Sequence, residues 1–397
     1  MNVFLMNTKH RKDVLEMNGK IIPRWLGEFW TSKQRQASSL HEISYRACFK
    51  AQLPRFFIER FSKEGDIVFD PFSGRGTTVI EAGLLGRRII ANDVNPISRI
   101  LCSPRFFIPD LQALEQRLDS IPFNKQERAD IDLSMFYHPS TESEIVTIKK
   151  YLRKRRRSGF EDDMDRWLRM VATNRLTGHS PGFFSVYTFP PNQAVAADRQ
   201  KLINKKRKQK PEYRDTKKII LGKSKQLLRD ITEDNIKTLQ TIGRSAVFID
   251  GDARYAKAIP SRSVQLTVTS PPFLDIVKYT DDNWLRVWFN DIDSHKVVRA
   301  VTMSKTLEDW AEVMAGVFEE LFRITRDGGW VAFEVGEIRN GKIRLDELVV
   351  PIGIKAGFEC KGIVVNQQLF TKTSNIWGVV NNSKGTNSNR IVLFSKA

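Results

Sequence analysis

Cysteine is scarce in this chain of 397 residues, and long apolar runs are missing from it. Cys48, Cys102 and Cys360 are far apart and form no CxxC pair, which excludes a zinc knuckle and a disulfide framework and favours a reducing compartment. No stretch approaches the roughly 20 apolar residues that a membrane span needs, and the N-terminus becomes charged before a signal-like apolar core develops. We therefore expect a cytosolic protein.

Basic residues are plentiful by contrast. The chain has 64 Lys and Arg against 46 Asp and Glu, a net charge of +18. Such an excess attracts polyanions, either nucleic acid or an anionic membrane surface. Because no membrane segment is apparent, the charge favours nucleic acid. A hydrophobic content of 41% is enough for a sizeable core, and the length indicates two to three domains.

Short β-branched runs alternate with helical patterns in two parts of the chain, which is typical of a parallel sheet covered by helices. In the first part, the pattern predicts a helix over 49–62, a strand over 66–70, a helix over 77–85 and a strand over 88–93. These elements form one βαβ unit.

The second part runs from 246 to the end. It contains a long amphipathic helix over 307–325 and five strand candidates, AVFID, VQLTVTS, WVAFEV, GIVV and RIVLF. The stretch between the two parts is mostly helical or irregular. We therefore predict one α/β sheet divided into residues 1–100 and 246–397, with residues 101–245 as an insertion.

The insertion carries most of the positive charge. Residues 199–229 contain 13 Lys or Arg and 2 acidic residues, a local excess of 11. A second basic run, RKRRR at 153–157, precedes EDDMD at 161–165, so we expect part of its charge to be neutralised locally. Residues 178–194 interleave aromatic side chains with Ser, Asn and Gln, a composition suited to base and backbone contacts. The alternative is a solvated positive surface.

The first chemical motif is DPFSGRGTT, from Asp70 to Thr78, where a buried strand turns into a helix. Gly74 and Gly76 allow a sharp turn and a close approach to a ligand. A phosphate-binding P-loop needs a Lys after the last glycine, and a dinucleotide fingerprint needs a third glycine where the chain has Val79. Neither phosphate-binding pattern fits the loop.

A ligand without phosphates fits better. Asp70 is able to accept a hydrogen bond from an ammonium group, and Asp93, 19 residues after Gly74, is able to accept from two ribose hydroxyls. These groups belong to an adenosine with an amino acid attached. By itself, however, the loop is equally consistent with a tight turn whose acidic residue caps a helix.

The second motif is TSPPF, residues 269–273, directly after the strand VQLTV. Two consecutive prolines fix φ and remove two N–H groups, so the adjoining carbonyls are held rigidly as acceptors. Ser270 adds a hydroxyl, and Phe273 adds a flat face on which a nucleobase stacks. The alternative is an ordinary Pro-Pro turn after a strand.

Together the motifs resemble the S-adenosylmethionine-dependent DNA amino-methyltransferases. DPFSGRGTT is similar to their cofactor loop, ANDVNP to their ribose-binding acidic position, and TSPPF to their catalytic tetrapeptide. Residues 41–61 resemble the helix that closes over the methionine end of the cofactor. The resemblance implies a Rossmann-like, seven-stranded sheet with an antiparallel last strand, and no metal. It also implies catalytic roles for Ser270, Pro271, Pro272 and Phe273, and cofactor contacts from Asp70, Phe72, Gly74, Gly76, Thr77, Thr78, Asp93 and Asp252.

The resemblance further implies methyl transfer to an exocyclic amine of a base flipped out of double-stranded DNA. Ser at the first tetrapeptide position favours cytosine N4, with adenine N6 as the alternative. Cytosine C5 chemistry is disfavoured because none of the three cysteines follows a proline. Further alternatives are an RNA or tRNA guanine-N2 methyltransferase and a non-catalytic DNA-binding protein on the same scaffold. We expect a prokaryotic protein at the nucleoid, with a separately encoded restriction endonuclease as a candidate partner.

Overall fold

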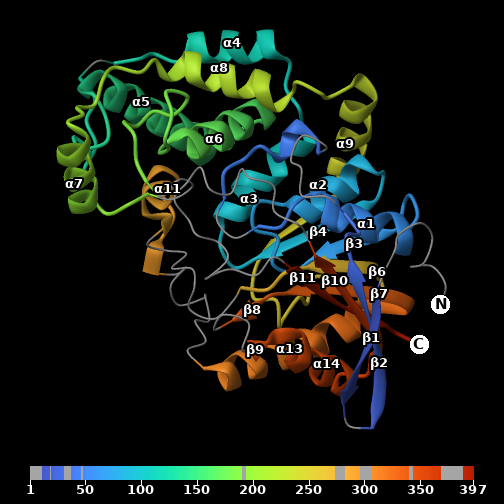
Figure 1. Cartoon of the computed structure of the whole chain (residues 1–397). Helices are drawn as coiled ribbons and strands as arrows, with labels where there is room; N and C mark the ends of the chain where they lie inside the picture. Colours follow the sequence, from blue (N-terminus) through green and yellow to red (C-terminus); the bar gives the residue numbers. More distant parts are fainter. Residues whose placement is uncertain are drawn as a thin grey trace.

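The computed structural model describes residues 11–17, 19–30, 37–45, 48–124, 126–189, 194–272, 282–295, 306–338, 343–367 and 388–397. Helices flank both faces of a large sheet, and a further layer of helices lies above it (Figure 1). The strands are β1 (Arg11–Met17), β2 (Lys20–Gly27), β3 (Ile67–Asp70), β4 (Arg88–Asp93), β5 (Val247–Asp250), β6 (Val264–Thr269), β7 (Thr325–Val335), β8 (Glu337–Ile338), β9 (Ile343–Arg344), β10 (Glu359–Gln367) and β11 (Ser388–Ser395). The helices are α1 (Gln52–Phe61), α2 (Thr77–Leu84), α3 (Ile97–Cys102), α4 (Leu111–Ser120), α5 (Pro139–Arg157), α6 (Asp163–Arg175), α7 (Ala197–Arg207), α8 (Thr216–Leu227), α9 (Glu233–Ser245), α11 (Trp284–Phe289), α13 (Leu307–Ile324) and α14 (Leu345–Lys355).

Within the described residues, nine strands form one sheet in the order β1-β2-β10-β11-β7-β6-β3-β4-β5. The run from β7 to β5 is parallel, whereas β11 is antiparallel to both β7 and β10. The α/β class and the antiparallel last strand are therefore confirmed. The strand order reverses between β3 and β6, and open α/β sheets bind ligands beside the carboxyl ends of strands at such a point.

The sheet has two more strands than the seven predicted. The hairpin β1–β2 extends it beyond β10, to which β2 is parallel. A cross-strand ion pair joins Arg24 to Asp13 at 2.6 Å. Charged side chains are common on edge strands because they discourage further pairing. Because of these charged residues, the hairpin lacks the β-branched runs from which the other strands were predicted.

The sheet has one apolar core on each face. Neighbouring residues alternate between these cores: Val68 contributes to one core and Phe69 to the other, and Ala332 and Phe333 divide in the same way. This alternation follows from the period of two residues along a strand. Helices α1, α2 and α9 cover the first face, and α13 and α14 cover the second. In the described part of the chain, no helix is long and apolar enough to cross a membrane.

Helix α1 is shorter than predicted, since it begins at Gln52 and not at residue 49. The segment before it was expected to be helical from residue 41. In the structure Ser39–His41 is a single 3-10 turn, and residues 42–45 are irregular. Buried arginines bind the carbonyls of this segment, which takes them away from a helical hydrogen-bond ladder.

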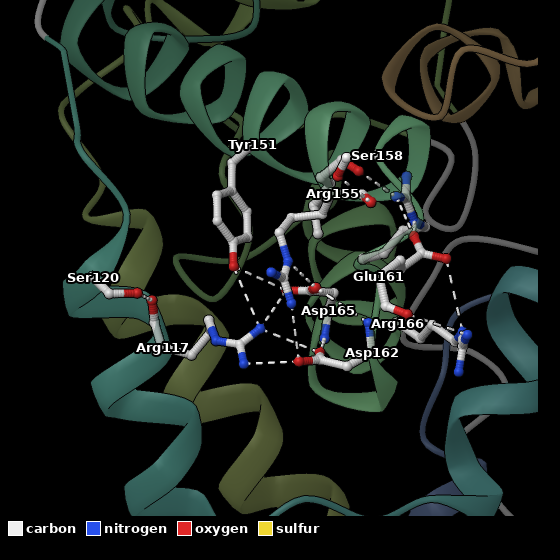
Figure 2. Close-up of polar contacts among 11 residues, drawn as sticks. Arg117, Ser120, Tyr151, Arg155, Ser158, Glu161, Asp162, Asp165 and Arg166 are labelled. Atoms are coloured by element: carbon white, nitrogen blue, oxygen red, sulfur yellow. Dashed lines mark hydrogen bonds and ion pairs between the residues drawn. The ribbon is translucent and has the colours of Figure 1, made fainter.

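The insertion forms the upper helical layer, where α4, α5, α6 and α8 lie together (Figure 1). Part of its positive charge is neutralised locally, as expected. Arg155 of the RKRRR run donates to the buried carboxylate of Asp165 at 2.7 Å and to Asp162, and Arg117 binds the same two carboxylates (Figure 2). Apolar residues of the insertion belong to the same core as one face of the sheet. The domain boundaries at residues 100 and 245 remain a prediction.

Candidate functional site

The two predicted motifs meet at the carboxyl ends of β3 and β6. Thr269 Oγ1 donates a hydrogen bond to Asp70 Oδ1 at 2.7 Å, and Thr78 Oγ1 donates to the carbonyl of Val268 at 3.0 Å. The glycine loop after β3 and the Ser-Pro-Pro turn after β6 are therefore neighbours, although 199 residues separate Asp70 from Thr269.

Asp70 is a buried carboxylate with an exposed fraction of 1%. Burial raises the pKa of this carboxyl to about 7, despite hydrogen bonds from Thr269 and the Phe72 amide. Among the described residues, no cation is a main cause of that pKa shift. A buried anion without a counter-charge is costly, so a ligand ammonium group would be stabilised here. The loop thus fits a cationic amino-acid group.

Asp93 ends β4 and faces the same loop. Its carboxylate accepts from the Gly74 amide at 2.8 Å and from the Asn95 amide at 2.9 Å. Burial raises its pKa to about 6. Each oxygen retains a lone pair beyond these bonds, as a contact to ribose hydroxyls requires.

The two loop glycines are needed for different reasons. Both have positive φ, +50° at Gly74 and +81° at Gly76, so the sharp turn requires them. A Cβ on Gly74 would touch the Tyr45 ring at 3.3 Å, whereas a Cβ on Gly76 would overlap the Cys102 thiol. The space beside Gly76 is therefore filled by the protein's own core, and the expected close approach of a ligand there does not explain the glycine.

We expect Gly76→Ala to lower the free energy of unfolding by about 3 kcal/mol, from backbone strain and overlap with Cys102. Gly65 is a matched control because its φ is also +81° and nothing lies within 4 Å of a Cβ there. Gly65→Ala should cost about 1 kcal/mol. Urea unfolding of both variants measures the difference. Equal losses would contradict the packing explanation, as would failure of Cys102→Ala to recover part of the Gly76→Ala loss.

Three other predicted cofactor residues have protein partners. Thr77 Oγ1 accepts from Arg75 Nε at 3.2 Å, and the Asp252 carboxylate, beyond β5, is bound by Arg254 at 2.6 Å. The Phe72 side chain is partly buried against the second core. Asn92 Nδ2 donates to the carbonyls of Pro71 and Gly251, both at 3.0 Å, and so holds Asp252 near the glycine loop.

A buried arginine pair, not predicted from the sequence, fixes the segment 40–45 against the glycine loop. Arg75 donates to the carbonyls of His41 and Ile43, at 3.0 and 2.9 Å. Arg105 donates to the carbonyls of Leu40 and Arg75. Carbonyl recognition by an arginine has no sequence signature, because any residue supplies the acceptor. The pair places the Tyr45 ring over the loop.

Ser270 lies beside a carboxylate that sequence reasoning missed. Its hydroxyl is near enough to Glu334 of β7 to lower the pKa of that carboxyl, and Glu334 accepts from Asn389 Nδ2 of β11 at 3.0 Å. Burial raises the pKa of Glu334, whose exposed fraction is 7%. The sequence showed only that Glu334 lies in a predicted strand. It did not show that this strand, β7, pairs with β6, which ends beside Ser270.

The prolines of the tetrapeptide are held from the second face of the sheet. Pro271 is buried, and the carbonyl of Pro272 accepts a hydrogen bond from Trp310 Nε1 at 3.1 Å. That carbonyl has one lone pair committed to α13, so Ser270 and the Pro271 carbonyl remain the better candidates to bind a substrate amine. Phe273 lies outside the described residues. Within those residues, no three His, Cys, Asp or Glu side chains gather as a metal site.

Comparisons with known proteins give a partial family match and several distant relatives. Residues 5–98 match the DNA methylase family model N6_N4_Mtase. The chain is 25% identical over 305 residues to the Type II methyltransferase M.BsoBI of Geobacillus stearothermophilus, covering 68% of this chain and 57% of that protein. It is 35% identical over 94 residues to a tRNA (guanine(10)-N2)-dimethyltransferase of Methanocaldococcus jannaschii, covering 23% of this chain and 24% of that protein. A solved rRNA methyltransferase, aviRa of Streptomyces viridochromogenes, aligns with 11% identity, a TM-score of 0.36, and 92% and 94% coverage.

The fold is thus a Rossmann-like α/β sheet, and the glycine loop and β4 lie within the residues that match the DNA methylase model. The resemblance to the S-adenosylmethionine-dependent DNA amino-methyltransferases is confirmed by the family model and by the relative M.BsoBI. The chain spans less than two thirds of the length of these curated relatives.

Proposed function

We propose that this protein transfers a methyl group from S-adenosylmethionine to the exocyclic N4 amine of a cytosine flipped out of double-stranded DNA. One observation carries the proposal: Thr269 joins the cofactor loop at Asp70, and the next residue, Ser270, contacts Glu334. These contacts support a subsite for a cationic amino-acid group and a polar acceptor at adjacent strand ends.

The cofactor supplies a methyl group on a positively charged sulfur. Asp70 would bind its ammonium group and Asp93 its ribose hydroxyls, while Asn92 holds the Gly251–Asp252 turn that would face its adenine. An exocyclic amine is a weak nucleophile because its lone pair is delocalised into the ring. The protein's contribution is therefore to position that amine and to bind its protons.

Ser270 and Glu334 form a chain suited to that task. In this proposal the hydroxyl proton of Ser270 is donated to Glu334, so the lone pairs of Ser270 remain to accept an N–H of the target amine. When the nitrogen attacks the methyl carbon, the carbon–sulfur bond would break with its electron pair left on the sulfur, and the positively charged nitrogen would then lose one proton. We propose that this proton passes through Ser270 to the Glu334 carboxylate and then to water.

Two other target amines are also supported by the comparisons. Adenine N6 presents the same amine chemistry, and the family model covers both kinds of enzyme by name. Guanine N2 in RNA is supported by the 35% identity of a 94-residue segment to the tRNA methyltransferase. The proposal places the protein in the cytoplasm, and a restriction endonuclease is its candidate partner.

Transfer of a labelled methyl group to duplex DNA and to tRNA, followed by mass analysis of the nucleosides, tests the proposal. The expected product is N4-methylcytosine in DNA. N6-methyladenine in DNA would show that the target base is adenine, although the enzyme would still be a DNA amino-methyltransferase. N2-methylguanosine in tRNA would show that the substrate is RNA. Label in neither polymer would favour a non-catalytic binder.

A further inference from the structure

A cavity of about 460 Å³ lies in the insertion, between the end of α6, the segment after it and α8. Four basic residues line it, and the carboxylate that lines it within the described residues is Asp215. Asp215 is exposed and caps α8 by accepting from the Lys218 amide at 2.9 Å. The lining basic residues are Arg175, Arg214, Lys218 and Lys223.

Two of these cations are buried without an ion pair. Arg175 and Lys223 have exposed fractions of 7% and 6%, and no carboxylate lies within ion-pair distance of either in the described part of the chain. Lys223 Nζ donates to the neutral side chain of Gln226 at 3.0 Å. Buried cations are normally paired, because desolvation of an isolated charge is costly.

Contacts with the surrounding protein fix the positions of the two guanidinium groups that line the cavity. Arg175 is stacked on Phe183, 3.9 Å from the ring centre, and its Nε is buried and unpartnered in the described structure. Arg214 donates to the carbonyls of Ser180, Phe183 and Ser185 through Nη1. Phe183 and Phe184 lie in the stretch 178–194, whose composition suggested base contacts, and both are buried.

The surroundings of Lys223 and Arg175 disfavour the charged form of both groups. Burial and the nearby Arg175 lower its pKa to about 7, against the attraction of Glu42 and together with the repulsion of Arg229. Burial and the charge of Arg286 lower the pKa of Arg175 to about 9. A bound anion would favour the charged form of both groups.

We infer that this cavity is an anion-binding site for a phosphate group of a polynucleotide, which is duplex DNA if the proposed function holds. Arg and Lys donors arranged around a phosphate are its usual ligands. Part of the basic stretch 199–229, from Arg214 to Gln226, lines the cavity, and the charge of the stretch would draw a polyanion towards it. The residue before Arg175, Asn174, donates to the Ser44 carbonyl at 3.1 Å, which links the cavity to the segment over the cofactor loop.

Lys223→Gln tests the site, with Lys225→Gln as the matched control. Both lysines lie on α8, but Lys225 is exposed and does not line the cavity. Sulfate is the first probe, because it does not titrate near neutral pH. In calorimetric titrations of the full chain, we expect sulfate affinity to fall at least about fivefold in Lys223→Gln and to stay within about twofold in Lys225→Gln. Thermal unfolding checks that both variants are folded.

Duplex DNA is the second probe. Fluorescence anisotropy over a range of salt concentrations should show Lys223→Gln binding about 5-fold to 10-fold more weakly, with a salt slope smaller by about 1. Sulfate should compete with DNA more strongly than chloride at equal ionic strength in the wild type, and this difference should vanish in Lys223→Gln.

Several results would overturn the inference. Absence of a sulfate site in the wild type would do so. Loss of sulfate binding in Lys223→Gln with unchanged DNA binding would mean an adventitious ion only. Equal DNA losses in both variants would indicate general surface charge, and deoxycytidine monophosphate binding far more tightly than sulfate would indicate a free-nucleotide site.

The experiments distinguish a failure of the proposed function from a failure of the cavity inference. If the wild type has the sulfate site and binds tRNA through Lys223 but methylates no DNA, the polynucleotide site stands and the DNA assignment is overturned. If DNA is methylated and bound equally well by the wild type and Lys223→Gln, the cavity inference alone is overturned.

Discussion

Ser270→Ala is expected to lower kcat by about 100-fold to 1000-fold, while the Kd for DNA changes by less than about threefold. The alanine removes the acceptor for the amine proton and the link to Glu334, but it leaves the phosphate contacts intact. Single-turnover methylation and anisotropy measure the two quantities. Ser270→Thr keeps the hydroxyl and should retain more activity than Ser270→Ala. Equal losses of turnover and DNA affinity would contradict the catalytic role.

Substitution of Glu334 tests the catalytic role of Ser270 in a second way. If Glu334 acts through Ser270, then Ser270→Ala with Glu334→Gln should be no slower than Ser270→Ala alone, because the second change removes an interaction already lost. Burial raises the pKa of Glu334, so kcat at saturating cofactor should fall as the pH drops through that pKa. This acid limb should disappear in Glu334→Gln. Additive losses would indicate a separate, structural contribution of Glu334.

Asp70→Asn should weaken binding of S-adenosylmethionine by about 30-fold or more, which corresponds to about 2 kcal/mol for one removed charge of a buried pair. Wild-type binding should strengthen from pH 6 to pH 7.5, because the Asp70 carboxyl, with a pKa of about 7, must ionise to meet the ammonium group. Asp93, with a pKa of about 6, contributes to the lower part of this rise. Calorimetry at several pH values measures both effects.

Protein stability is the control for Asp70→Asn. The raised pKa means that the folded protein holds a proton on Asp70 that the unfolded chain releases, so the wild type loses stability as the pH rises towards 7. The asparagine avoids that loss and still accepts from Thr269 and the Phe72 amide. Its free energy of unfolding at pH 8 should therefore equal or exceed that of the wild type. Unchanged cofactor affinity would contradict the proposed ammonium subsite.

The strands that the sequence predicted best are apolar runs in the parallel part of the sheet. RIIAND coincides with β4, and VFID and VQLTVT with β5 and β6, because apolar β-branched runs between turn residues have few other structures available. The hairpin β1–β2 escaped prediction because its charged edge position removes that apolar signal. The helix expected from residue 41 is absent for a tertiary reason, since Arg75 and Arg105 bind the carbonyls of Leu40, His41 and Ile43.

By itself the sequence determined the α/β class, the two motifs at strand ends and the concentration of charge in the insertion. Each of these depends on neighbours along the chain, through periodicity, turn chemistry or composition. Only the tertiary structure decided that Glu334 partners Ser270, that Cys102 occupies the space beside Gly76, and that Arg175 and Lys223 share a cavity. These contacts join residues far apart in the chain, and they depend on strand order and helix packing, for which local sequence patterns carry no information.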